Sequence, residues 1–184
     1  MITRRTFIVS GASLLATPAI AKHTVTSVTR SFRNHSWREH FNNLNKGAIL
    51  CDLDSRALFF WGPQGKVSKI YPTSVPRSPE MSRTGVTSVI EKRVGPTWRP
   101  TPSMRQRDPS LPAVVGPGPD NPLGSHAMYL TWQYYRIHGT HDRRKIGRQS
   151  SSGCVGLYNE HIEELFSLTP IGIPVKIIGQ NKAH

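Results

Sequence analysis

The sequence predicts a mostly β, largely antiparallel domain with one or two short helices and a proline-rich insertion. Three observations support this fold class. Short apolar runs alternate with turn-forming residues, Gly and Pro are frequent at 15 residues each, and helical periodicity is clear only near the C-terminus. This composition favours strands and loops over a helical bundle. A chain of 184 residues is long enough for one domain with its own core.

The first strands are expected in the N-terminal half of the domain. Residues 48–53 and 57–61 are apolar runs joined by polar residues 54–56, which is a hairpin pattern. Residues 66–71 and 84–93 alternate between apolar and polar side chains and are expected to be the third and fourth strands.

The C-terminal part adds strands and one helix. The further strands are expected at residues 127–132, 134–138 and 174–178. Before the last strand, Asn159 is a candidate helix N-cap, because its short side chain can accept a bond from a first-turn N–H. Ile162, Leu165 and Phe166 are spaced to form one apolar helix face, and Pro170 ends the helix.

A proline-rich insertion separates the two groups of strands. Residues 94–124 contain eight of the fifteen prolines, so neither a helix nor an interior strand is expected there. Trp98 and Met104 indicate that the insertion packs against the domain, where it could act as a lid over a cleft.

The N-terminus resembles an export signal. The paired arginines Arg4 and Arg5 precede Phe7 and the apolar residues 8–16, and a small-x-small cleavage pattern ends at Ala21. This order predicts a signal of the twin-arginine type over residues 1–21 and a periplasmic or cell-envelope location. The apolar run is too short for a stable membrane span, which needs about 20 apolar residues.

The remaining boundaries follow from composition. Residues 22–46 are a polar lead-in with a short helix expected near residues 36–45. The folded domain is expected over residues 47–179, followed by a tail at residues 180–184.

The chain is strongly basic, with a net charge of +13. Such a charge attracts polyanions, which include nucleic acid, anionic lipid and acidic cell-wall polymers. Because the sequence has no zinc-finger spacing, no aromatic RNA-binding motif and no basic helical stripe, nucleic acid is disfavoured as a partner.

The two cysteines have different surroundings. In an oxidising compartment a pair of cysteines would by default form a disulfide. Cys51, however, lies in an apolar strand-like run and is expected to be a small core residue, whereas Cys154 follows Gly153 in a turn of small residues. The sequence therefore predicts two free thiols.

Cys154 and His138 are the candidate catalytic residues. A thiol is mostly protonated at neutral pH, and a neighbouring imidazole can remove its proton and hold the thiolate as an ion pair. Gly153 permits a tight turn, where backbone N–H groups could face an oxyanion. His141, with His138 and Cys154, could instead form a three-ligand metal site, but this spacing is far less specific than paired Cys-x-x-Cys motifs.

Several segments together resemble the YkuD-type L,D-transpeptidase catalytic domain. The similar segments cover residues 47–178. They are Tyr135-Arg136-Ile137-His138-Gly139-Thr140, Ser151-Ser152-Gly153-Cys154-Val155, Asn159-Glu160-His161-Ile162, Gly172-Ile173-Pro174-Val175 and the proline-rich insertion. The resemblance implies a YkuD-like β sandwich or barrel.

The resemblance also implies a reaction. Cys154 would be the acylated nucleophile, His138 the general base, and Gly139 would orient the imidazole through its carbonyl. The substrate would be a peptidoglycan tetrapeptide stem, cleaved before its terminal D-Ala, and the acyl group would pass to an amine. Carbapenems would acylate the same thiol, and neither a metal nor an organic cofactor is implied.

Two positions depart from the family pattern. Ser152 stands where the motif usually has His, and Gly156 stands where Arg is common. Ser152, Gly153 and Arg148 are expected to form the substrate-binding and oxyanion side of the site, with Arg148 or Arg136 replacing the missing cation. Two alternatives remain open: a catalytically degenerate relative that binds cell wall, and a cysteine peptidase that hydrolyses stem peptides.

Overall fold

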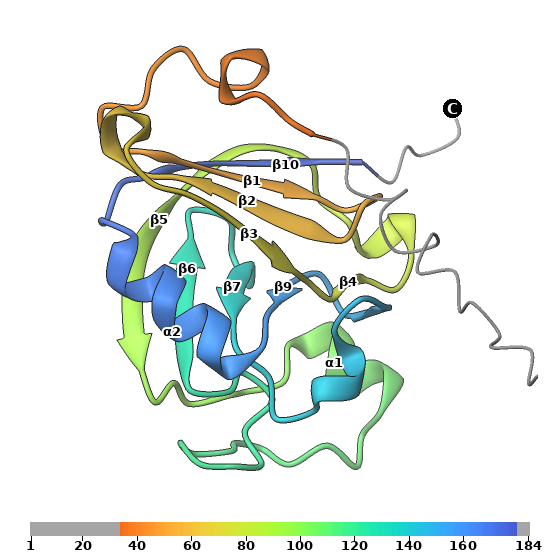
Figure 1. The fold of residues 1–184 in the computed structure, drawn as a ribbon. Coiled ribbons are helices and arrows are strands. Elements are labelled where there is room, and N and C mark those ends of the chain that lie inside the picture. The colour runs from red at the N-terminus through yellow and green to blue at the C-terminus, as the bar shows by residue number, and fades with distance from the viewer. Residues whose placement is uncertain (1–33, 180–184) are drawn as a thin grey trace, which may run out of the picture. The chain divides into compact units, whose positions relative to one another are not determined.

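A computed structural model describes residues 34–179, which form a curled β-sheet with two α-helices (Figure 1). The predicted export signal at residues 1–21, the lead-in before residue 34 and the tail at residues 180–184 lie outside the described residues. The predicted fold class, mostly β with one or two short helices, is confirmed.

Eight strands form the main sheet in the order β3-β2-β1-β10-β5-β6-β7-β9, and β4 pairs with β8 in a small second sheet. Most neighbours in the main sheet are antiparallel, while β1–β10 and β7–β9 are parallel. The bounds are β1 (Ala48–Asp52), β2 (Ala57–Trp61), β3 (Ser68–Pro72), β4 (Val75–Pro76), β5 (Gly85–Val94), β6 (His126–Leu130), β7 (Arg136–His138), β8 (Gln149–Ser151), β9 (Val155–Gly156) and β10 (Pro174–Ile178).

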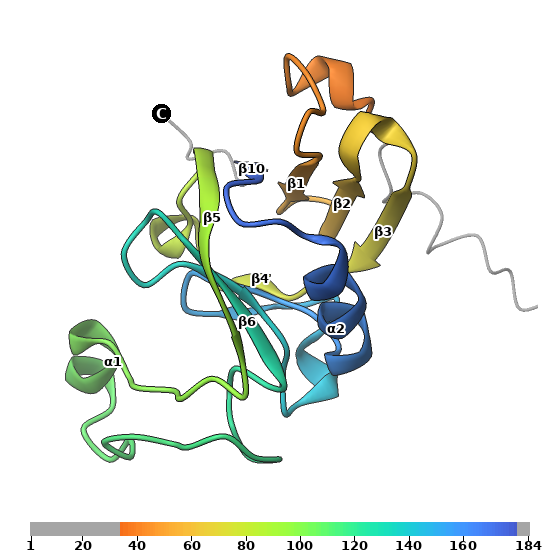
Figure 2. The same cartoon turned by 90° about the vertical axis from the view of Figure 1, so that its left-hand side faces the viewer.

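The long strand β5 joins the two halves of the sheet (Figure 2). Its first residues pair with β10, and its later residues pair with β6. The register with β6 shifts between Val89 and Glu91. An extra residue of this kind bends a strand and increases its twist. The bend lets β6, β7 and β9 curl away from the β1–β3 meander.

One core fills the inside of the curl. Helix α2 (Asn159–Leu168) packs its predicted apolar face there, with Ile162 and Leu165 fully buried and Phe166 partly buried. Cys51 is buried in the same core and is a free thiol, as predicted. Its burial raises its pKa far above the ordinary range, so Cys51 is unreactive.

A second apolar cluster covers the outer face of β1 and β2. Both strands are buried at every position, which explains why their sequences are continuous apolar runs instead of alternating ones. Phe59 and Trp61 belong to this cluster, and Trp37 and Phe41 of the lead-in pack against it. The helix predicted near residues 36–45 is only a 3₁₀ turn at Trp37–Glu39, because apolar packing holds the rest of this segment in an irregular conformation.

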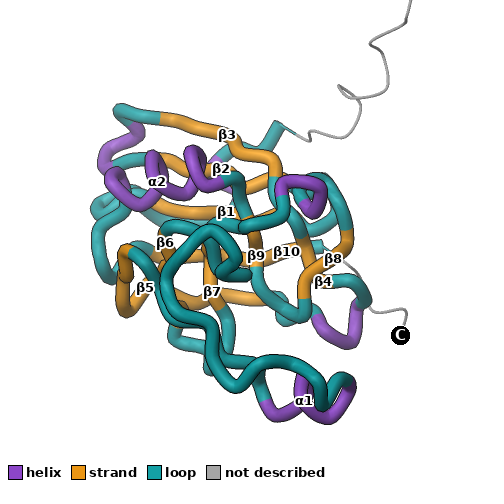
Figure 3. The backbone as a smooth tube through the Cα atoms, turned by 90° about the horizontal axis from the view of Figure 1, so that it is seen from below, coloured by secondary structure: helices purple, strands orange, loops and turns teal. Residues whose placement is uncertain are grey.

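The expectation that the insertion contains no helix is wrong. A short helix, α1 (Pro102–Arg107), interrupts an otherwise irregular insertion (Figure 3). Its proline occupies the first turn, where no N–H is needed, and the Thr101 hydroxyl accepts a hydrogen bond from Met104 N.

A buried asparagine organises the insertion. The Asn121 amide donates to the carbonyls of Pro96, Val115 and Gly116, and its oxygen accepts from Leu123 N. Asn121 is fully buried, so these bonds replace contacts with water that a loop would otherwise make. A single side chain therefore satisfies backbone groups from both ends of the insertion.

Two predicted boundaries at the C-terminal half are corrected. The strand expected at residues 134–138 begins at Arg136, because Tyr134 has a left-handed φ of 68°. The N-cap of α2 is Tyr158, and Asn159 is the first helical residue. The Asn159 side chain instead binds backbone groups outside the helix, which places it at the candidate site.

Within residues 34–179, no helix combines the length and apolar character needed to cross a bilayer.

Candidate active site

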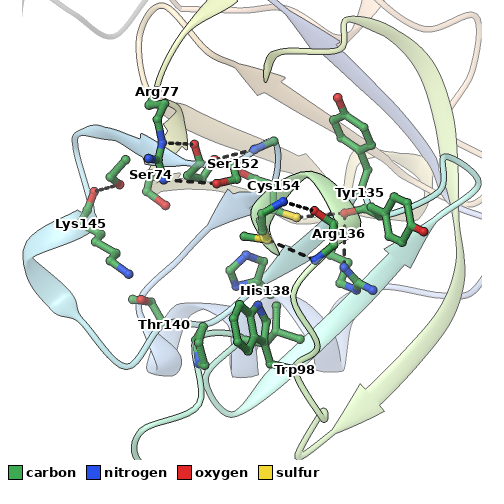
Figure 4. A pocket seen from close by; sticks show the side chains of 18 of the residues that line it. Ser74, Arg77, Trp98, Tyr135, Arg136, His138, Thr140, Lys145, Ser152 and Cys154 are labelled. Carbon is green, nitrogen blue, oxygen red and sulfur yellow. Dashed lines mark hydrogen bonds between the residues drawn. The ribbon is translucent and has the colours of Figure 1, made fainter. Parts of the chain in front are cut away.

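A pocket of about 290 Å³ brings together the segments that carry the candidate catalytic residues (Figure 4). His138 comes from the end of β7, and Cys154 comes from the turn between β8 and β9. Trp98, Met104 and Leu123 of the proline-rich insertion form a further wall. The predicted packing of the insertion against the domain is confirmed, and it lies beside the candidate nucleophile.

Local hydrogen bonds hold the turn that carries Cys154. The Ser151 hydroxyl donates to the Cys154 carbonyl at 2.6 Å and accepts from Gly153 N at 3.3 Å. Gly153 has a φ of +132°, and a Cβ there would lie 3.4 Å from the Met81 carbonyl oxygen and 3.6 Å from the Tyr135 ring. Only glycine fits this conformation without strain, and it leaves room beside the sulfur.

His138 is fixed by the carbonyl next to it. Its Nδ1 donates to Gly139 O at 2.5 Å, so Nε2 is the nitrogen with a free lone pair. The pKa of His138 is lowered to about 4, chiefly by burial and to a smaller extent by the charges of Arg136 and Lys145, whereas the hydrogen bond to the Gly139 carbonyl opposes the shift. The imidazole is therefore neutral at pH 7 and can accept a proton.

The Cys154 thiol lies against a strained carbonyl. Its Sγ donates to Tyr134 O at 3.3 Å, and the left-handed conformation of Tyr134 aims that carbonyl at the sulfur. Burial raises the pKa of Cys154, although the charge of Arg136 favours the thiolate. These shifts favour the neutral forms of both the thiol and the imidazole at rest.

A junction around Asn159 positions the His138–Thr140 segment. The Asn159 Oδ1 accepts from Ser125 N and Thr140 N, each at 3.1 Å. A Cβ at Gly139 would lie 2.3 Å from the same oxygen, and one at Gly124 would lie 2.2 Å from it. Glycine at both positions therefore lets two loops close on the start of α2. The sequence marks Asn159 as important but suggests the wrong role for it.

Basic side chains line the pocket. Arg77, Arg99, Arg136 and Lys145 all contribute to its wall. The Arg77 guanidinium donates to the Ser152 hydroxyl at 3.2 Å, and the Arg107 guanidinium approaches the same oxygen at 3.5 Å. Ser152 therefore lies at a cationic edge of the pocket. Arg77 was not identified from the sequence, since it lies far from the motif.

The structure does not bring Arg148 into the pocket. Arg148 is not among the lining residues, and its carbonyl accepts from Val75 N in the small second sheet. Arg136, the other residue considered as a replacement for the missing cation, does line the pocket.

Gly156 is required by its neighbour across the sheet. A Cβ at this position would lie 2.4 Å from the Ser74 hydroxyl and 3.8 Å from His138 Cε1. Ser74 is also bonded to Gly156 through both backbone groups, with N···O distances of 2.8 and 3.1 Å. Ser74 thus occupies the space that a larger side chain at position 156 would need. The glycine therefore leaves no gap beside His138.

The alternative metal site does not form. Among residues 34–179, His138, His141 and Cys154 do not constitute a group with clustered ligand atoms. The only such three-residue group found in this part of the chain lies elsewhere, around His35.

Comparison with known proteins identifies the family. The model of the YkuD family, described as the L,D-transpeptidase catalytic domain, matches residues 46–177. The chain belongs to this family. A putative L,D-transpeptidase of Fuscovulum blasticum is 49% identical over 92% of this chain and 91% of that protein. The probable L,D-transpeptidase ErfK/SrfK of Escherichia coli is 38% identical over 76% of this chain, which spans 46% of that relative.

Solved L,D-transpeptidase structures share the fold. The Ldtfm–avibactam carbamoyl enzyme superposes with a TM-score of 0.58 at 20% identity, over 74% of this chain and 50% of that one. The LD transpeptidase LdtMt1 in complex with imipenem superposes with a TM-score of 0.55 at 15% identity, over 72% and 59% of the two chains. At these identities the L,D-transpeptidase comparison supports the fold alone.

The Asn159 junction gives a first testable prediction. Replacing Asn159 with Ala leaves Ser125 N and Thr140 N without their acceptor. The free energy of unfolding should fall by about 1–3 kcal/mol for each donor left buried and unpaired. Urea titration monitored by tryptophan fluorescence measures this loss.

The matched control is Asn159→Asp, which keeps an acceptor oxygen and places a negative charge at the N-terminus of α2. This variant should be close to wild type in stability. An alanine variant as stable as wild type, or an aspartate variant as unstable as the alanine variant, would contradict the assigned role.

Proposed function

We propose that this chain is a cell-envelope L,D-transpeptidase in which Cys154 is the nucleophile and His138 the general base. The observation that carries the proposal is that both side chains line one pocket, with the His138 Nδ1 bound to the Gly139 carbonyl. That bond leaves the basic Nε2 free and supports the proposal that Gly139 orients the imidazole.

The proposed reaction has two acyl-transfer steps. Cys154 Sγ attacks the carbonyl carbon of the L-centre that precedes the terminal D-Ala, and His138 Nε2 takes the thiol proton. The proton then passes to the leaving amine of D-Ala as the peptide bond breaks, leaving a thioester. In the second step an amine attacks the thioester, loses its proton to His138 and restores the thiol. A stem diaminopimelate as acceptor would give a 3-3 cross-link.

The neutral resting pair fits this sequence of steps. Because burial opposes charge on both Cys154 and His138, proton transfer is favourable only as the thiol attacks a bound carbonyl. The Gly153–Cys154 turn is the candidate oxyanion site, since charge develops on the carbonyl oxygen beside it. The Gly153 N–H donates to Ser151 Oγ. This hydrogen bond must break if the N–H is to bind the oxyanion.

The cationic pocket wall supports an anionic substrate. Arg77, Arg99, Arg136 and Lys145 surround the space beside the thiol, and a stem peptide carries free carboxylates. Guanidinium groups bind carboxylates through paired, charge-assisted hydrogen bonds. We assign Arg77, through its contact with Ser152, to the binding of a stem carboxylate, in place of Arg148.

Acylation by a carbapenem tests the nucleophile. Mature protein exposed to imipenem should gain one adduct by intact-mass spectrometry, because a thioester forms at Cys154. The complex of LdtMt1 with imipenem is the precedent for using this probe. The Cys154→Ala variant should gain no adduct, whereas Cys51→Ala should still gain one, since Cys51 is buried in the core.

The absence of an adduct on intact wild-type protein, together with no activity on tetrapeptide stems, would favour the degenerate wall-binding alternative. In that case Cys154→Ala would leave binding to sacculi unchanged. Product analysis with and without an amine acceptor separates a transferase from a peptidase, because a peptidase releases the same hydrolysis product in both.

The pH dependence of acylation tests the assignment of His138. Because the folded pKa of His138 is about 4, the imidazole stays neutral and basic well below pH 6.5. The second-order rate of acylation by imipenem should therefore fall on the acid side near pH 4 and not near 6.5. Stopped-flow measurements from acid to neutral pH follow this limb.

Lys145→Gln is the matched variant for this profile. The charge of Lys145 lowers the pKa of His138, so its removal should move the acid limb to higher pH. A wild-type limb centred at 6.5, or a downward shift in the variant, would speak against His138 as the titrating base.

We also propose export through the N-terminal arginine pair. The combined change Arg4→Lys and Arg5→Lys should block transport by the twin-arginine route, so the protein should remain in the cytoplasm at full length. Cell fractionation and intact mass report this, with wild type expected to begin at Lys22 in the envelope fraction. Arg38→Lys, outside the signal, should be exported normally, and unchanged export of the double variant would refute the proposed route.

A further inference from the structure

A second cluster of ionisable side chains lies outside the Cys154 pocket, on the lead-in segment. The candidate ligand atoms of His35, Glu39 and His40 all lie within 4.8 Å of one another. His35 Nδ1 and His40 Nε2 are 3.1 Å apart, and Glu39 Oε2 is 3.9 Å from His40 Nε2. The 3₁₀ turn at Trp37–Glu39 brings these three side chains to the same place.

A buried carboxylate fixes the orientation of His35. Its Nε2 donates to Asp52 Oδ2 at 3.0 Å, and the other Asp52 oxygen accepts from Asp54 N and Ser55 N. Because Nε2 carries the proton for this bond, Nδ1 presents a lone pair to His40. A carboxylate behind one imidazole nitrogen, with the other nitrogen facing a shared point, is the usual surrounding of a metal-binding histidine.

The distances suit a tetrahedral ion. Two nitrogens that each lie 2.0–2.1 Å from Zn²⁺ are about 3.4 Å apart in tetrahedral geometry, only a few tenths of an ångström wider than the pair seen here. The Glu39 side chain is 64% exposed, so its carboxylate is free to rotate toward the two rings. Its exposure also leaves one side open for a water molecule as fourth ligand.

Packing holds the two rings in place. The His35 ring lies edge-on to Phe59 at 5.0 Å, and both histidine side chains are about nine-tenths buried. The His35 ring cannot turn away without losing its contacts with Phe59 and Asp52, so this ligand is held in place for a bound ion.

The charges also balance. Glu39 and Asp52 together carry two negative charges, which offset a divalent ion, while Lys176 acts on His40 with a positive charge. In the absence of an ion, His40 Nε2 donates to the lone pair of His35 Nδ1. Metal binding replaces this hydrogen bond and requires the proton of neutral His40 to move from Nε2 to Nδ1.

We propose that His35 Nδ1, Glu39 and His40 Nε2 form a site for Zn²⁺, with Asp52 orienting His35 from behind. The ion would fasten the lead-in segment over the outer face of β1 and β2. None of the three ligands lines the Cys154 pocket, so the zinc site is separate from the proposed catalytic site. The proposed reaction does not involve the ion.

Zinc titration of the full mature chain tests the site. Protein stripped with EDTA and passed into metal-free buffer is titrated with ZnCl₂ by calorimetry, both as wild type and as Cys154→Ser, so that the catalytic thiol cannot supply the binding. One equivalent should bind in both proteins. Co²⁺ should give the visible absorption of a tetrahedral ion without a thiolate charge-transfer band, even in wild type.

Three substitutions locate the ligands. Glu39→Gln and His40→Gln should abolish tight binding, and Asp52→Asn should weaken it about 10–100-fold while all three ligands remain. His141→Gln, an exposed histidine outside the cluster, should bind as wild type. Circular dichroism in EDTA checks that each variant is folded. If His40→Gln does not fold, Glu39→Gln is the variant that decides.

Several results would overturn the proposal. They are no zinc binding by Cys154→Ser, binding that folded Glu39→Gln and Asp52→Asn retain at full strength, or an equal loss of affinity in His141→Gln. In each case the cluster would be a hydrogen-bonded chain that only ties the lead-in to Asp52.

Discussion

The arrangement of the candidate site depends on two hydrogen bonds to one side-chain oxygen. Asn159 Oδ1 accepts from Ser125 N and Thr140 N, and so joins the start of α2 to the end of the insertion and to the loop after β7. Because glycine stands at positions 124 and 139, both loops approach this oxygen closely. The Gly139 carbonyl is then held where it accepts a hydrogen bond from His138 Nδ1. The basic nitrogen of the site is therefore oriented by a helix that does not enter the pocket.

The bend in β5 supplies the larger framework. It curls the sheet around a core closed by α2, and beyond β6 the strands β7 and β9 pair as parallel neighbours. His138 ends β7, and Cys154 directly precedes β9, so the pairing of these strands helps to bring both residues to one pocket. The insertion, organised by Asn121, adds an apolar wall on the same side.

Electrostatics in the pocket differ from those of a preformed thiolate–imidazolium pair. Burial acts in the same direction on both groups, because it disfavours charge on the thiol and on the imidazole. The surrounding arginines and Lys145 supply positive charge that suits an anionic substrate and further disfavours an imidazolium. Part of the chain's basic charge is therefore concentrated at the edge of this pocket, where the guanidinium groups of Arg77 and Arg107 both contact the Ser152 hydroxyl.

The sequence alone determined the fold class, most strands and the family, and it singled out Cys154 and His138, which line one pocket, because apolar periodicity and a compact motif are local signals. It also determined that Cys51 is a core residue. The tertiary structure decided what depends on contacts between distant segments. Asn159 binds two loops instead of capping its helix, Arg77 and not Arg148 lines the pocket, and Ser74 occupies the space that a side chain at Gly156 would need. It also decided that His35 is bonded to Asp52 and that His40 is bonded to His35. The partners in the side-chain hydrogen bonds of His35, Asn159 and Arg77 lie 17 to 75 residues apart, so only the folded chain brings them together.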